Sequence, residues 1–160
     1  MIEVRVGRLE EAEAQALLRP VAADGSAVTA AMRRFEAAAG PAPAAQFERQ
    51  GDLPVGSATL TGAGELGADF IVNVVVRSAS EPVTEAGVER GLINGLRRVR
   101  EWAIDHVALV PIGTGAGNLD PEVAAGLLAR VLDAERHEGL RVTVLAESEY
   151  EREIVTRALG

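Results

Sequence analysis

The spacing of hydrophobic residues in the first third of the chain changes from an alternating to a helical period. Residues 2–6 alternate between Ile or Val and a charged side chain, which is typical of a half-exposed strand. Residues 10–18 are rich in alanine and glutamate and predict a helix. Apolar residues at helical spacing predict a second helix over 26–39, which the Gly-Pro-Ala-Pro run at 40–43 ends. Residues 44–56 are polar and predict a loop.

The last two thirds of the chain alternate between strand-length apolar runs and longer amphipathic segments. The nearly continuous β-branched run at 70–76 is typical of a strand buried on both faces. The other predicted strands cover 57–61, 107–112 and 141–146, and the predicted helices cover 83–104, 121–137 and 148–159. This alternation predicts an α/β fold with a largely parallel sheet. No repeat or long linker divides the 160 residues, which predicts one domain.

The strand predicted at 107–112 runs into a glycine-rich loop, the most informative segment of the chain. The loop consists of Gly113, Thr114, Gly115, Ala116, Gly117 and Asn118. Asp120 can cap the helix that follows, and Pro121 suits its first turn. Glycines allow positive φ and a close approach to a ligand, and successive amides in such a turn can bind an anion. The segment predicts a phosphate loop at the carboxyl end of a strand, although the same glycines would also suit a turn without a ligand.

Composition removes several other classes of function. All sixteen basic residues are arginine, so the loop lacks the lysine of a Walker loop and no Schiff-base chemistry is available. Asn118 stands where the dinucleotide pattern G-x-G-x-x-G requires its last glycine. A net charge of −8 disfavours general nucleic-acid binding, and the absence of cysteine excludes disulfides and cysteine-ligated zinc. The two histidines have no partner at metal-ligand spacing, so we expect no metal and no cofactor.

The sequence also lacks the features of a secreted or membrane protein. No leader is visible at its start, and no apolar run approaches the roughly 20 residues of a membrane span. We therefore expect a cytoplasmic protein that does not contact a membrane.

Two segments of the chain resemble macro domains, the family of modules that bind ADP-ribose. Residues 55–73, which read VGSATLTGAGELGADFIVN, resemble the family's vGeavvTgagnLpakyvIH. Residues 113–122, which read GTGAGNLDPE, resemble its second phosphate loop, GTGxGGLPxe. Their order and separation also agree with the family. The resemblance implies a three-layer α/β/α sandwich with a mixed, largely parallel central sheet, formed by a single macro-like domain over residues 1–160.

The first third of the chain departs from the family. Arg8 stands where the family has an aspartate that reads the adenine amino group, and an arginine can only donate. The family's DAIVNAAN falls on residues 15–22, and its last asparagine, which positions the distal ribose and supports hydrolysis, aligns with Ala22. Asp24 or Ser26 can take over part of that lost role. The first phosphate loop is reduced to Gly25, Ser26 and Ala27.

These observations leave three functions in view. The first is a divergent macro-type module that binds ADP-ribose or a related nucleotide diphosphate through residues 113–118, without efficient hydrolase activity. The second is an ADP-ribosyl or O-acetyl-ADP-ribose hydrolase assisted by Asp24 or Ser26. The third is a ligand-free protein of macro-like fold that serves self-association as a homo-oligomer. The first two make a small-molecule nucleotide the expected partner.

Overall fold

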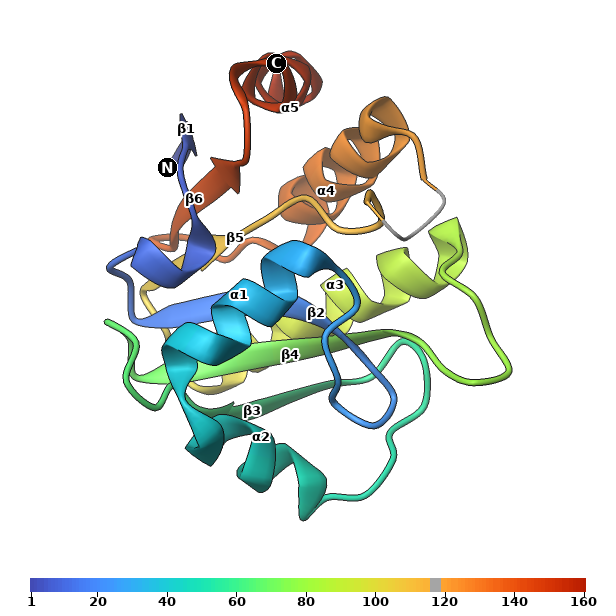
Figure 1. The fold of residues 1–160 in the computed structure, drawn as a ribbon. Helices are drawn as coiled ribbons and strands as arrows, with labels where there is room; N and C mark the ends of the chain where they lie inside the picture. The colour runs from blue at the N-terminus through green and yellow to red at the C-terminus, as the bar shows by residue number, and fades with distance from the viewer. Residues whose placement is uncertain (116–118) are drawn as a thin grey trace.

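The computed structural model describes residues 1–115 and 119–160. Within them, six strands form one sheet in the order β1-β6-β5-β2-β4-β3 (Figure 1). The strands are β1 (Ile2–Val6), β2 (Ala16–Ala22), β3 (Ala58–Gly62), β4 (Phe70–Arg77), β5 (His106–Leu109) and β6 (Arg141–Ala146). Neighbouring strands are parallel except for the antiparallel pair of β3 and β4. The mixed, largely parallel sheet predicted above is therefore confirmed.

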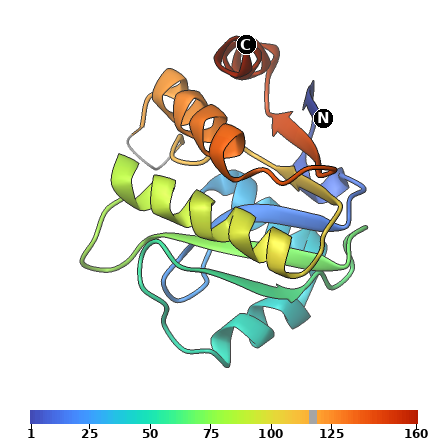
Figure 2. The ribbon, with the colours of Figure 1, turned by 180° about the vertical axis from the view of Figure 1, so that it is seen from behind.

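Helices cover both faces of this sheet and complete the three-layer α/β/α sandwich. They are the short 3-10 turn η1 (Leu9–Glu11), α1 (Ala30–Ala39), α2 (Pro41–Glu48), α3 (Glu85–Glu101), α4 (Pro121–Glu135) and α5 (Glu149–Leu159). Helices α1 and α2 lie on one face (Figure 1), and α3 and α4 lie on the other (Figure 2). Helix α5 packs against α4 and contacts β1 and β6. None of the helices in the described ranges has the length and apolar character needed to cross a bilayer.

The helix predicted over residues 10–18 is wrong. Residues 9–11 form the single turn η1, and the central strand β2 begins at Ala16. Every residue of β2 is buried, because the strand pairs with β4 and β5 at its edges and helices cover both faces of the sheet. Burial of this apolar run and its two-sided pairing outweigh the weak helix preference of alanine and glutamate, which is a few tenths of a kcal/mol per residue.

Pro20 lies inside β2, where a missing N–H would ordinarily break a hydrogen-bond ladder. The N–H of Ala23 donates to a carbonyl of β4 at 2.8 Å. Because alternate residues of a strand face opposite neighbours, the ring nitrogen of Pro20 faces β5 instead. Pairing between β2 and β5 ends at Leu18 and Leu109. The proline therefore removes no ladder bond, and it marks the point where the two strands separate.

The loop predicted over residues 44–56 is also partly wrong, because residues 41–48 form helix α2. Gly40, with φ of 79°, ends α1 and precedes α2. Pro41 occupies the first turn of α2, where a missing N–H costs nothing. The Gly-Pro-Ala-Pro run at 40–43, from which we predicted only the end of one helix, thus also contains the start of the next helix.

The segment around the glycine loop differs in two details from the prediction. Strand β5 ends at Leu109, three residues earlier than expected. Asp120 and Pro121 do occupy the start of α4 as predicted, but the Asp120 side chain makes no capping hydrogen bond.

A stripe of glycines lets α3 approach the sheet closely. Gly87, Gly91 and Gly95 are spaced by four residues and are buried. Gly91 and Gly95 face β4 and β2, whereas Gly87 faces Val55 in the loop before β3. A Cβ on Gly95 would lie 2.9 Å from a methyl of Leu18, and a Cβ on Gly91 would overlap the side chain of Val74. Real carbon atoms do not approach so closely, so the distance between α3 and the sheet depends on these glycines.

Candidate functional site

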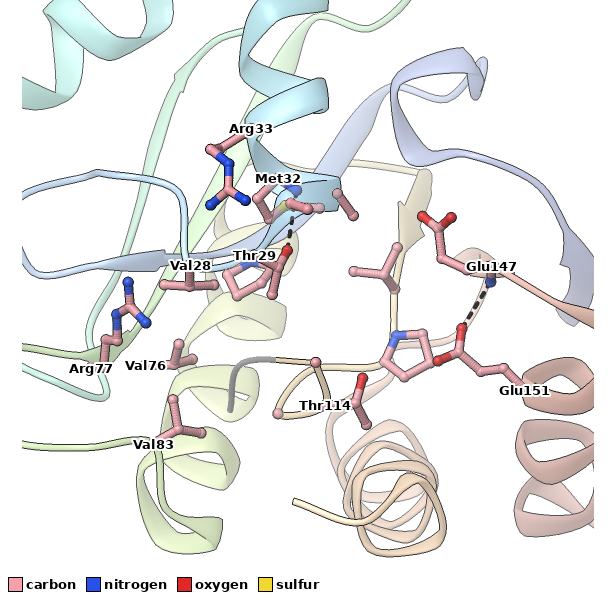
Figure 3. Close-up of a pocket in the computed structure, with 17 residues that line it drawn as sticks. Val28, Thr29, Met32, Arg33, Val76, Arg77, Val83, Thr114, Glu147 and Glu151 are labelled. Atoms are coloured by element: carbon pink, nitrogen blue, oxygen red, sulfur yellow. Dashed lines mark hydrogen bonds between the residues drawn. The ribbon is translucent and has the colours of Figure 1, made fainter. Parts of the chain in front are cut away.

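A cavity opens at the carboxyl edge of the sheet, where β2 and β5 separate. Beyond Leu18 and Leu109 the two strands no longer pair, and the chain leaves β5 through Val110 and Pro111. The cavity has a volume of about 430 Å³, and both Pro20 and Pro111 line it (Figure 3). Open α/β sheets bind ligands at such a switch point, because neighbouring chains leave the sheet there in opposite directions.

The first wall of the cavity is the amino-terminal end of α1. Thr29 caps this helix, and its Oγ1 accepts a hydrogen bond from the N–H of Met32 at 3.1 Å. Thr29, Ala30 and Ala31 all line the cavity. First-turn amides have no carbonyl partner within their own helix and carry the positive end of the helix dipole. This wall therefore favours a negatively charged group.

The glycine-rich loop forms the opposite wall. Gly113, Thr114 and Gly115 line the same cavity, and the two glycines have φ of 112° and 75°. A Cβ on Gly115 would lie 3.3 Å from Cγ2 of Thr29, so the loop approaches the cap of α1 closely. Within the described ranges, no residue accepts a hydrogen bond from the N–H of Thr114 or Gly115. The other predicted loop residues, Ala116, Gly117 and Asn118, lie outside those ranges.

Charged residues gather at two sides of this largely apolar cavity. Arg33 of α1 and Arg77 at the end of β4 lie on one side, and Glu147 and Glu151 lie on the other (Figure 3). No carboxylate in the described ranges forms an ion pair with Arg33 or Arg77. Apolar side chains line the space between the two sides, among them Val28, Val76, Val83 and Val110.

The residues predicted for the first loop lie elsewhere. Asp24, Gly25 and Ser26 line a separate hollow of about 380 Å³ beside α2, and Ala27 lines neither space. Oδ1 of Asp24 accepts hydrogen bonds from the N–H and the Oγ of Ser26, at 2.9 and 2.6 Å, and these bonds lower the pKa of Asp24. Gly25 has φ of 87° and packs against Phe47, so it shapes the turn. The structure does not bring Asp24 or Ser26 to the glycine loop.

Arg19 does not fill the cavity either. Its guanidinium is buried between β2 and α1, where it donates to Oδ1 of Asn73 at 3.2 Å and to Oε1 of Glu36 at 3.1 Å. The guanidinium carbon also lies 5.3 Å from the centre of the Phe35 ring. Burial lowers the pKa of Arg19, and Glu36 opposes that shift. This polar cluster fixes the middle of α1 to the sheet and leaves the cavity at the helix start open.

Sequence reasoning missed several residues that line the cavity. Thr29 carries a readable signal, since a threonine before a helical run is a common cap, but the predicted helix began three residues earlier. Arg33 and Arg77 have no local signal, because only the fold brings the first turns of α1 next to the end of β4. Glu147 and Glu151 belong to an acidic run that resembles an ordinary solvated helix start.

Comparison with known proteins agrees with this architecture. The family model of the macro domain matches residues 21–128. A macro domain-containing protein of Caldanaerobacter subterraneus subsp. tengcongensis is 29% identical over 129 residues, which cover 71% of each chain.

Solved macrodomains share the fold. The macrodomain of Oceanobacillus iheyensis, solved with ADP, aligns with a TM-score of 0.87 over 99% of this chain and 89% of that chain, at 18% identity. The macrodomain of Thermus aquaticus DarG aligns with a TM-score of 0.77 over 91% of this chain and 98% of that chain, at 26% identity. Since the family model covers more than half of the residues, the chain belongs to the macro domain family.

Proposed function

We propose that the chain binds ADP-ribose or a related nucleoside diphosphate in the cavity between α1 and the glycine-rich loop. The observation that carries the proposal is the pairing of two amide-rich elements across one open space. The first turn of α1 presents its amides from one wall, and Gly113, Thr114 and Gly115 present theirs from the other. Two such walls can hold the two phosphates of one diphosphate. A macrodomain with the same fold has been solved with ADP.

We also propose that binding occurs without efficient hydrolysis. The two residues that could assist an attacking water, Asp24 and Ser26, line a different hollow from the glycine loop. Ala22 offers no side-chain amide at the end of β2. Enzymes that hydrogen-bond their substrates lose orders of magnitude when the polar partner is removed. We therefore expect the release of ADP-ribose from a mono-ADP-ribosylated protein to be slow.

Thermal unfolding with ADP-ribose, ADP and AMP tests the binding proposal. A ligand at about 100 times its Kd adds about 2.7 kcal/mol of stability, which raises the Tm of a domain of this size by about 5–10 °C. The two diphosphates should stabilise the protein more than AMP does. No shift with either diphosphate at millimolar concentration contradicts the proposal. An oligomer in light scattering that also lacks any ligand response would favour self-association instead.

A pair of glycine variants separates loss of the site from loss of stability. Gly115→Val places a branched side chain against Thr29 inside the cavity. Gly139→Val is the matched control, because Gly139 has φ of 87°, is exposed like Gly115, and has no atom within 4 Å of a built Cβ. Both variants carry strain at positive φ. We expect only Gly115→Val to lose the ligand-induced shift, and an unchanged shift in that variant would contradict the placement of the phosphates.

A further inference from the structure

The sheet ends on one side at β1, which has a strand partner along one edge only. That partner is β6, and both views place β1 at the margin of the molecule (Figure 1 and Figure 2). The other outer strand, β3, is less open, because the N–H of Gly62 already donates to Oε1 of Gln46 in α2 at 2.7 Å. An edge strand with free backbone groups can accept a further strand. The free edge of β1 is therefore the place where the sheet can be extended.

Every second residue of β1 directs its backbone away from β6. Just after the strand, the N–H of Gly7 donates to the carbonyl of Ala146 at the end of β6, at 3.0 Å. Alternate residues of a strand face opposite neighbours, so the odd-numbered residues of β1 face β6. The backbone N–H and C=O groups of Ile2, Val4 and Val6 consequently face the free edge.

The side chains of β1 are arranged symmetrically about Val4. Ile2 and Val4 pack against the core on one face of the strand. Glu3 and Arg5 stand on the other face, with side chains that are 62% and 53% exposed. Oε1 of Glu3 lies 3.9 Å from Nε of Arg5 in the same strand, but an ion pair this exposed contributes little to stability. Both charges can therefore meet a second chain instead.

We propose that two copies of the chain associate through β1, antiparallel and with Val4 opposite Val4 of the second copy. In this register the residues that face the free edge form hydrogen-bonded pairs, Ile2 with Val6 and Val4 with Val4, and each pair exchanges two bonds. Glu3 of each copy then lies opposite Arg5 of the other, at the positions between these pairs where side chains approach most closely. The two sheets become one, and the surface is its own complement, as a twofold dimer requires.

The charges also select this register. Charged side chains on an edge strand normally prevent association. A shift of the second copy by two residues keeps the backbone groups in phase, but it places Glu3 opposite Glu3 or Arg5 opposite Arg5, which is unfavourable. Only the register centred on Val4 pairs opposite charges. The net charge of −8 opposes the approach of two copies, so association should require a high protein concentration.

The proposed interface is separate from the proposed nucleotide site. The cavity opens where β2 and β5 separate, and β6 lies between β5 and β1 in the sheet. No residue of β1 lines the cavity. Association and ligand binding are therefore independent properties, and either can fail without the other.

Sedimentation equilibrium, from micromolar to millimolar protein, tests the association. We expect a reversible equilibrium between monomer and dimer in the wild type. Glu3→Arg places arginines opposite each other at two positions of the dimer, so dimerisation should weaken by at least about tenfold, even though the variant has a smaller net negative charge. Arg5→Glu combined with Glu3→Arg exchanges the two charges and restores their pairing, so dimerisation should return to within about threefold of the wild type.

Glu81→Arg is the matched control. It makes the same change of charge at an exposed residue in the loop between β4 and α3, and three strands separate β4 from β1 in the sheet. This variant should dimerise at least as tightly as the wild type, and the Tm of each variant shows whether it is folded. A wild type that stays monomeric at millimolar concentration would overturn the inference. So would a dimer that Glu3→Arg leaves unchanged, or one that the exchange of both charges fails to restore in a folded variant.

Discussion

The buried pair of Arg19 and Glu36 predicts an unequal response to removal of its two charges. The Arg19 side chain is 5% exposed, whereas that of Glu36 is 32% exposed. Glu36→Gln leaves a buried guanidinium without a counter-charge, and breaking a buried pair in this way costs about 3–5 kcal/mol. Because water can partly reach the position of Glu36, we expect the lower limit, about 3 kcal/mol. This loss is a large part of the 5–15 kcal/mol that typically stabilises a domain.

Removal of both charges should cost less than removal of Glu36 alone. Arg19→Met combined with Glu36→Gln eliminates the buried charge and keeps an apolar side chain of similar length against Phe35. Oδ1 of Asn73 then loses its donor, which costs about 1–2 kcal/mol. We therefore expect the double variant to be more stable than Glu36→Gln by at least about 1 kcal/mol.

Urea unfolding monitored by circular dichroism measures these differences, provided that the slope m stays constant across the variants. On the same estimate, Glu36→Gln should lower Tm by about 6–12 °C. Two results would refute the reasoning. One is a Glu36→Gln variant as stable as the wild type, and the other is a double variant whose loss equals the sum of the single losses.

Three further predictions follow from the fold and the two hollows. Gly91→Ala should cost about 1–3 kcal/mol in urea unfolding because its Cβ overlaps β4, whereas Gly126→Ala, with no atom within 4 Å of a built Cβ, should be neutral or stabilising. Burial, together with Arg141, lowers the pKa of His106 below 6.5. As the pH falls, the unfolded chain therefore binds a proton at a higher pH than the folded chain does. The free energy of unfolding should fall as the pH drops below about 6.5, and the His106→Gln variant should lack this pH-dependent loss. Asp24→Ala should not weaken the affinity for ADP-ribose in calorimetry, because Asp24 lines the other hollow and its negative charge acts against the attraction of Arg77 for an anion.

The elements that the sequence predicts well are those whose local pattern agrees with their place in the fold. The β-branched run that becomes β4 is buried over Ile71–Val76, as its lack of alternation implies. Ser148 precedes α5 and accepts a hydrogen bond from the N–H of Glu151, as expected of a cap. In both segments, propensity, burial and end signals indicate the same structure.

The predictions fail where tertiary contacts, and not the local sequence, determine the structure. Residues 16–18 follow an alanine- and glutamate-rich stretch that favours a helix, yet they form the middle of the sheet because β4 and β5 pair on both sides of them. The candidate site can likewise be predicted only where its signal is local. Gly113, Thr114 and Gly115 are readable as a loop because their signal is local. The opposite wall is built from residues more than 80 positions earlier in the chain, and no local pattern announces that Thr29 will face Gly115.

The proline in the central strand also protects the molecule from unwanted association. A strand that extends past its neighbour normally offers free backbone donors and acceptors, and these invite an extended peptide or another protein's edge to join the sheet. Pro20 has no donor to offer on that side. A strand from another protein would lack the first backbone hydrogen bond on this side of β2. The gap between β2 and β5 can therefore admit a small ligand without acting as an edge for strand addition.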